Sequence, residues 1–172
     1  MSSFREFACA LLVLIASAAA TSAHVTLTQR TAPADSYFRA VFTIPHGCEG
    51  AATTKVSIWL PENVLQAKPQ VKPGWKAEII RVVLEKEVSG PHGEKITQRV
   101  AKVIFSGGSI PDDHIDEFVL QLRLPKEAGV LYFPVEQECG EKRLGWREIP
   151  AANQTTRDLR NPAVMLNVTP KP

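Results

Sequence analysis

The chain has 172 residues, and its 20 Lys and Arg residues nearly balance 18 Asp and Glu residues, which leaves a formal net charge of +2. A charge this small argues against nucleic acid or an anionic membrane surface as a partner. The length suits one domain with a substantial hydrophobic core, and we expect no second domain.

Residues 1–23 have the features of a secretory signal peptide. Arg5 precedes an apolar run at residues 7–20, and small residues follow up to Ala23. The run falls short of the roughly 20 apolar residues that a membrane-spanning helix needs, so we expect removal rather than anchoring. No second apolar run follows, and we expect a soluble periplasmic or secreted product without a membrane anchor.

The residue after the signal peptide is the first candidate for chemistry. Cleavage after Ala23 makes His24 the first residue of a domain at residues 24–172, whereas cleavage after Ala20, which also fits, leaves Thr21 first. An amino-terminal histidine offers a metal two nitrogens, its α-amine and its ring Nδ1, which form one chelate. Nitrogen donors suit Cu(II), which binds them more tightly than the other divalent first-row ions.

The rest of the chain predicts an all-β fold. Short runs rich in β-branched and aromatic residues alternate with Pro and Gly, and no long helical period is visible. The expected strands lie at His24–Gln29, Tyr37–Ile44, Thr54–Leu60, Lys76–Glu87, Ile96–Phe105, Glu117–Leu124, Val130–Gln137, Lys142–Ile149 and Val164–Val168. This number and spacing favour a two-sheet antiparallel β-sandwich, immunoglobulin-like or cupredoxin-like, over a closed barrel.

The connections carry further expectations. Residues 89–93 predict a hairpin tip, residues 61–65 a turn of helix, and residues 107–114 a loop before the strand that starts at Glu117.

The three cysteines bear on whether the chain contains a disulfide or free thiols. Cys9 leaves with the signal peptide, whereas Cys48 and Cys139 remain in a chain bound for an oxidising compartment. A disulfide between them is the first expectation. The alternative makes the two thiols soft ligands for Cu(I), although they lack the close spacing of thiolate metal sites.

Few other residues suggest a site. Glu117 points away from the apolar face of its strand, where a solvated charge is the ordinary outcome, and Trp146 is first expected in the core. His46, His92 and His114 lack the spacing of a two-histidine site, although Asp112 and Asp113 lie beside His114. No phosphate loop, nucleophile elbow, metalloprotease motif or blue-copper ligand set is present, so we expect no enzyme.

Together, these motifs resemble the YcnI-like family of secreted copper-binding domains. The resemblance covers residues 24–168 and depends on His24-Val25-Thr26-Leu27, Ile44-Pro45-His46-Gly47-Cys48, Pro73-Gly74-Trp75, residues 106–114 through Glu117-Phe118, Gln137-Glu138-Cys139, and Trp146. It implies a β-sandwich that binds one Cu(II) through a single-histidine brace. In that brace His24 supplies amine and ring, Glu117 matches a glutamate ligand, and Trp146 matches a tryptophan beside the ion. Many relatives also carry a carboxy-terminal membrane anchor, which this sequence lacks.

The resemblance also implies a copper chaperone or acquisition factor, with a copper-trafficking protein or a membrane copper importer as partner. Two alternatives stay open. The first is a copper monooxygenase, which also begins with a histidine but braces the ion with a second one. The second is a metal-free β-sandwich that serves as an interaction module.

Overall fold

The computed structural model describes residues 24–90 and 93–172. The expected signal peptide, with Cys9, lies outside the described residues, and so does His92.

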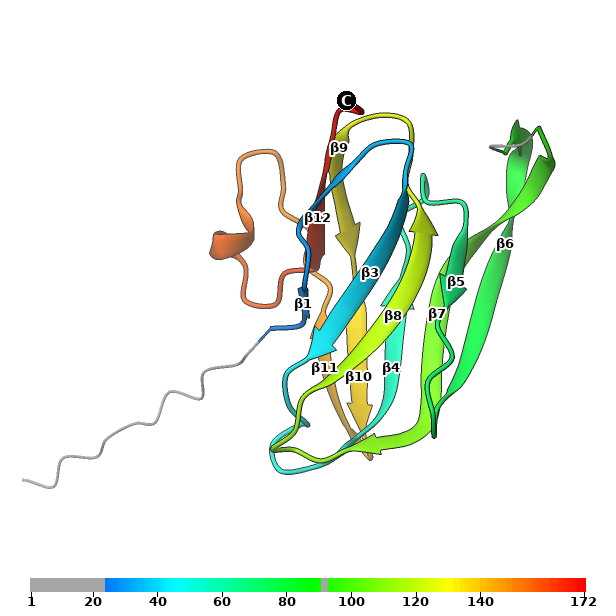
Figure 1. Cartoon of the computed structure of the whole chain (residues 1–172). Coiled ribbons are helices and arrows are strands. Elements are labelled where there is room, and N and C mark those ends of the chain that lie inside the picture. Colours follow the sequence, from blue (N-terminus) through cyan, green and yellow to red (C-terminus); the bar gives the residue numbers. More distant parts are fainter. Residues whose placement is uncertain (1–23, 91–92) are drawn as a thin grey trace, which may run out of the picture.

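Two β-sheets face each other and form the body of the protein (Figure 1). The first sheet has the strand order β1 (Thr26–Leu27), β3 (Tyr37–Ile44), β8 (Asp116–Arg123) and β5 (Ala67–Pro69). The second has the order β11 (Lys142–Trp146), β10 (Val135–Cys139), β4 (Thr53–Trp59), β7 (Lys95–Ile110) and β6 (Lys76–Ser89). The predicted all-β sandwich is therefore confirmed.

A smaller third sheet lies at one side of the two layers. It has the order β2 (Thr31–Pro33), β12 (Val164–Thr169) and β9 (Gly129–Phe133). Its β2–β12 pair is parallel, whereas the other strand pairs of the described chain are antiparallel. The connection between β11 and β12 includes a short 3-10 helix, Thr156–Asp158.

The alternation of apolar residues along β8 produces the core as expected. Phe118, Leu120 and Leu122 are fully buried, and their neighbours in register on β3 are Phe42, Ala40 and Phe38. The opposing sheet contributes Phe105, whose ring centroid lies 4.8 Å from that of Phe118. Burial of these side chains contributes about 25 cal/mol per Å² of apolar area and holds the two sheets together.

Several expected boundaries are wrong. Pro134 divides the single strand expected at residues 130–137 into β9 and β10, because a proline cannot donate a ladder hydrogen bond. Residues 61–65 form a turn closed by the Val64 N–H and the Pro61 carbonyl rather than a helix. The first strand is two residues long, and β2 and β5 were not predicted.

The loop expected from Gly107 starts later, because β7 continues to Ile110. A Cβ on Gly108 would lie only 2.1 Å from Cε2 of Trp75. The indole of Trp75 therefore packs directly on the strand backbone, and it contacts Phe118 edge-on at a centroid distance of 4.9 Å. The glycine marks a close approach within a strand rather than a turn.

A disulfide links Cys48 to Cys139, 91 residues apart in sequence. The alternative of two thiols as Cu(I) ligands is therefore wrong. Closing a loop of this length contributes about 4 to 5 kcal/mol in the chain-entropy account. Beside the bridge, the amide nitrogen of the fully buried Gln137 donates to the carbonyl oxygen of His46 at 2.6 Å and fixes the loop before β4.

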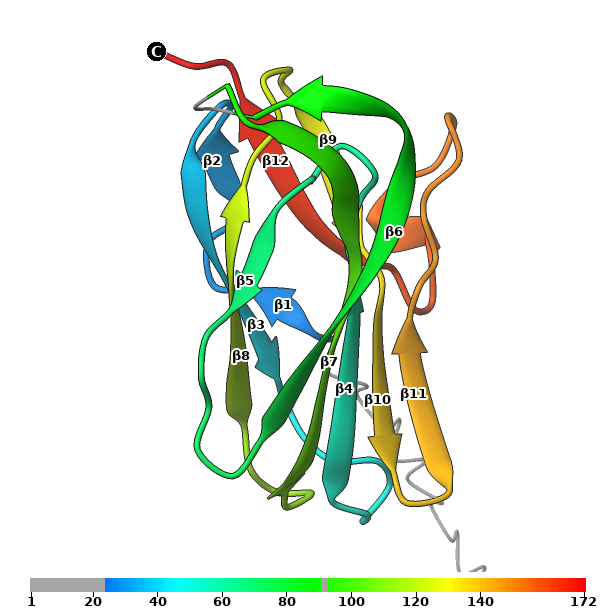
Figure 2. The ribbon, with the colours of Figure 1, turned by 90° about the vertical axis from the view of Figure 1, so that its right-hand side faces the viewer.

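The β6–β7 hairpin extends past the sandwich and curves over one end of it (Figure 2). Ser89 pairs with Lys95, and the Gly90 N–H donates to the carbonyl oxygen of Glu94, which confirms the expected hairpin. Residues 91 and 92 lie outside the described residues.

Candidate functional site

His24 is the first described residue and lies at an exposed position beside the third sheet. The alternation of buried and outward-facing residues along this segment places His24 there. Val25 and Leu27 are 4% and 3% exposed and anchor the amino-terminal segment in the core, while His24 and Thr26 alternate with them and face outward. The buried side chain of Val25 therefore holds the backbone at the start of the domain in place.

One hydrogen bond orients the imidazole ring of His24. Its Nε2 lies 3.1 Å from the carbonyl oxygen of Arg160. A carbonyl oxygen can only accept, so Nε2 carries the hydrogen and, in the neutral ring, the lone pair resides on Nδ1. This tautomer is the one that a chelate through the α-amine and Nδ1 requires, and second-shell hydrogen bonds of this kind orient many metal-binding histidines.

The peptide group between Arg160 and Asn161 is itself held in place. Its N–H donates to the Glu148 carboxylate at 2.9 Å. The carbonyl oxygen of Asn161 accepts the N–H groups of Arg147 and Glu148, both at 3.0 Å. The partner of the His24 ring is thus tied to the chain that leaves β11 directly after Trp146.

A groove of about 530 Å³ runs beside His24. Arg30 and Arg157 contribute its charged side chains, and Leu159 and Met165 contribute apolar surface. Among the described residues, no Asp or Glu lines it. The segment between β11 and β12, drawn in orange, projects beside β1 on this side of the molecule (Figure 1).

Glu117 lies on the exposed face of β8 but lines a different groove. It pairs in register with Thr43, which pairs in turn with Thr26, so Glu117 is two strands away from the start of β1. Two strand spacings of about 4.8 Å separate Glu117 from Thr26, and His24 lies two residues further along. The groove beside Glu117, of about 350 Å³, includes Lys72 and Asp116 but not His24. The two predicted ligands, His24 and Glu117, therefore line separate grooves of the described chain.

Trp146 is a core residue with 1% exposure, the position first expected from its strand. Its indole N–H is buried and has no hydrogen-bond partner among the described residues. Buried donors without a partner are rare in folded proteins, and this one precedes the chain segment that holds the partner of His24. A place beside a metal ion remains a prediction for Trp146.

Neither His46 nor His114 belongs to a group of three metal-ligand side chains in the described part of the chain. In the ranges 24–90 and 93–172, no group of three His, Cys, Asp or Glu side chains is arranged to hold a metal ion. His114 is exposed and its Nδ1 contacts Asp113 at 2.6 Å, a hydrogen bond that lowers the pKa of the Asp113 carboxyl. His46 contacts the carbonyl oxygen of Gly47 through its Nδ1.

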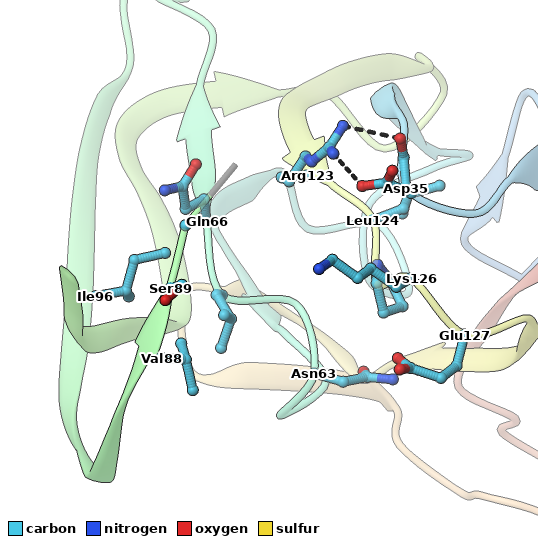
Figure 3. Close-up of a pocket in the computed structure, with 13 residues that line it drawn as sticks. Asp35, Asn63, Gln66, Val88, Ser89, Ile96, Arg123, Leu124, Lys126 and Glu127 are labelled. Atoms are coloured by element: carbon cyan, nitrogen blue, oxygen red, sulfur yellow. Dashed lines mark hydrogen bonds and ion pairs between the residues drawn. The ribbon is translucent and has the colours of Figure 1, made fainter. Parts of the chain in front are cut away.

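Another groove, of about 580 Å³, lies away from His24 under the curved β6–β7 hairpin (Figure 3). Its clearest polar feature is Asp35, whose carboxylate pairs with Arg123 and accepts a hydrogen bond from Lys171 at 2.8 Å. These cations hold the pKa of the Asp35 carboxyl below its usual value, with the Lys171 hydrogen bond as the main cause. Because the Asp35 carboxylate is already paired with two cations, it joins the end of β8 and Lys171 to the turn between β2 and β3 rather than offering a ligand.

Known structures support the immunoglobulin-like architecture. A protein from Nocardia farcinica, described as uncharacterized with an immunoglobulin-like fold, has 27% sequence identity and a TM-score of 0.63. That match covers 84% of this chain and 97% of the other. A putative membrane anchored protein from Corynebacterium diphtheriae has 11% identity and a TM-score of 0.38. That match covers 84% of this chain and 33% of the other.

Other comparisons define the family. No curated protein matches the sequence. In the described ranges, no helix has the length and apolar character needed to cross a membrane. The family model described as "Domain of unknown function (DUF1775)" matches residues 24–168, which is most of the chain and includes His24, Glu117 and Trp146. The chain therefore belongs to the DUF1775 family, the domain family of the YcnI-like proteins.

Proposed function

We propose that this protein is an exported Cu(II)-binding protein that carries one ion at its amino-terminal histidine. Cleavage after Ala23 frees the α-amine of His24, which then chelates the ion together with Nδ1. The observation that carries the proposal is the hydrogen bond between Nε2 of His24 and the Arg160 carbonyl oxygen, because it leaves the lone pair on Nδ1.

The arrangement of the other ligand types supports an amino-terminal chelate. No group of three His, Cys, Asp or Glu side chains in the described ranges is arranged to hold a metal, which favours a site that includes a donor other than a side chain. A free α-amine is such a donor, and it comes already attached to the imidazole. Both are nitrogen donors of the kind that Cu(II) prefers.

Glu117 is the proposed oxygen donor and Trp146 the proposed neighbour of the ion. In the described chain Glu117 and His24 line separate grooves, and the ion would join them. We propose that the protein delivers copper to, or receives it from, a copper-trafficking protein or a membrane importer in the periplasm or outside the cell. The Cys48–Cys139 disulfide supports an oxidising compartment.

The proposed role is binding and transfer without turnover. A copper monooxygenase would brace the ion with a second histidine, and neither His46 nor His114 lines the groove that contains His24.

Electron paramagnetic resonance of Cu(II) added to protein that begins at His24 tests the proposal. One equivalent should give a single axial spectrum with hyperfine structure from nitrogen. Oxidation of a polysaccharide by the copper-loaded protein and a reductant would support the monooxygenase instead, and absence of any bound copper would favour the metal-free interaction module.

A further inference from the structure

The groove beside His24 has an unbalanced positive charge. Arg30 and Arg157 are exposed and line it, and neither forms a salt bridge within the described chain. The two carboxylates of the adjoining segment are already occupied. Asp158 accepts the Thr155 N–H at 2.7 Å, which lowers the pKa of the Asp158 carboxyl, and Glu148 accepts the Asn161 N–H at 2.9 Å. Two guanidinium groups therefore remain available to an external anion.

The size and surface of the groove restrict that anion. A volume of about 530 Å³ lies in the range of small-molecule sites. Leu159, Pro162 and Met165 give it apolar surface against which a short carbon chain could pack. Guanidinium groups bind carboxylates through paired N–H donors, and two arginines suit a ligand with two carboxylates.

We propose that this groove binds a small dicarboxylate or tricarboxylate and that one of its carboxylates donates an oxygen to copper held at His24. The second half of this inference rests on the proposed function. It assigns the oxygen donor on the groove side to a molecule from solution, because residues 24–90 and 93–172 place no Asp or Glu in the lining of the groove.

The first experiment uses copper-free protein that begins at His24. Succinate is titrated while amide resonances are followed by NMR, and the shifts should centre on the backbone of residues 157–165. The double variant Arg30→Gln, Arg157→Gln should raise the dissociation constant about fivefold or more. Arg81→Gln, which removes another exposed arginine, on β6, should leave the dissociation constant unchanged. Equal binding by the two variants, or shifts centred elsewhere, would overturn the site.

Two further experiments distinguish a small carboxylate ligand from an acidic protein segment and test the link to copper. A capped Glu-Glu dipeptide has the same charge as succinate, and markedly tighter binding of the dipeptide would assign the groove to an acidic protein segment instead of a small ligand. In the copper-loaded protein, succinate should change the paramagnetic resonance parameters, and the double arginine variant should abolish that change. Succinate binding without any spectral change would overturn the link to copper. Failure of copper to bind at all would refute the proposed function while leaving the NMR result intact.

Discussion

The peptide group that joins Arg160 to Asn161 connects His24 to Glu148. Its carbonyl oxygen lies 3.1 Å from Nε2 of His24, and its N–H donates to the Glu148 carboxylate at 2.9 Å. The carboxylate therefore fixes the group that orients the imidazole, although the side chains of His24 and Glu148 are on opposite sides of that peptide.

Glu148→Ala should loosen this peptide group without unfolding the protein, because Glu148 is exposed. We expect faster hydrogen exchange at the Asn161 amide and a loss of copper affinity of a few fold, since both nitrogen donors of His24 remain. Amide exchange by NMR and a copper competition titration measure the two effects. Glu141→Ala, at an exposed turn, is the control. Identical exchange at Asn161 in both variants would show that Glu148 does not hold the segment.

Glu117→Gln tests the predicted oxygen ligand. The side chain is exposed on β8, so the substitution should leave the melting temperature within about 1 °C. If Glu117 donates an oxygen to copper, the Cu(II) affinity of the variant should fall. The decrease should be smaller than the decrease caused by loss of the chelate at His24. Glu127→Gln, at another exposed site, serves as the matched change. Equal copper affinity in the two variants would remove Glu117 from the site and leave the oxygen donor to an external carboxylate.

Gly108→Ala tests the packing of Trp75 on β7. The added Cβ would lie 2.1 Å from the indole, so the ring or the strand must shift. Overpacking of this kind costs about 1 to 3 kcal/mol in the free energy of unfolding. At Gly145 the same change meets only the Arg147 side chain at 3.4 Å and should cost much less. Urea unfolding of both variants compares them, and equal losses would contradict the close contact.

Asp35→Asn tests the ion pairs at the end of the sandwich. Lys171 and Arg123 lower the pKa of the Asp35 carboxyl below its ordinary value, with the Lys171 hydrogen bond as the main cause. A lowered folded-state pKa contributes stability above the unfolded-state value, and that contribution disappears as pH falls through the folded-state value. The asparagine variant should therefore be less stable than the parent at pH 7 and equally stable near pH 2. Urea unfolding of both proteins between pH 2 and pH 7 measures the difference in their free energies of unfolding. A difference that does not change with pH would contradict the assigned ion pairs.

Strand periodicity predicted most of the fold because each sheet buries one face. The alternation through Phe118, Leu120 and Leu122 identified a core strand correctly, and the cysteine count identified the disulfide. The wrong expectations arose at single residues. Gly108 was expected in a loop, but it lies within β7 and the Trp75 indole packs against it. Pro134 separates β9 from β10, although one apolar pattern runs through both strands.

The site was less predictable. Only its place after the predicted signal peptide identified His24. Its contact with Arg160 joins residues 136 apart through a backbone carbonyl, which the sequence does not reveal. The charged groove depends on the fold of the segment before β12, which has no periodicity. Sequence could suggest Glu117 and Trp146 as neighbours of the ion only through family resemblance, and their positions on separate sheets could not be foreseen.

The most direct test compares copper binding by protein that begins at His24 with protein that carries one extra Gly before it. The extension keeps every side chain but converts the α-amine of His24 into a peptide nitrogen, so the chelate is lost. Competition titration should show Cu(II) affinity lower by orders of magnitude in the extended protein. The melting temperature without copper should be the same in both, because the core begins at Val25. Equal copper affinity, with the extra residue verified by mass, would contradict an amino-terminal copper site.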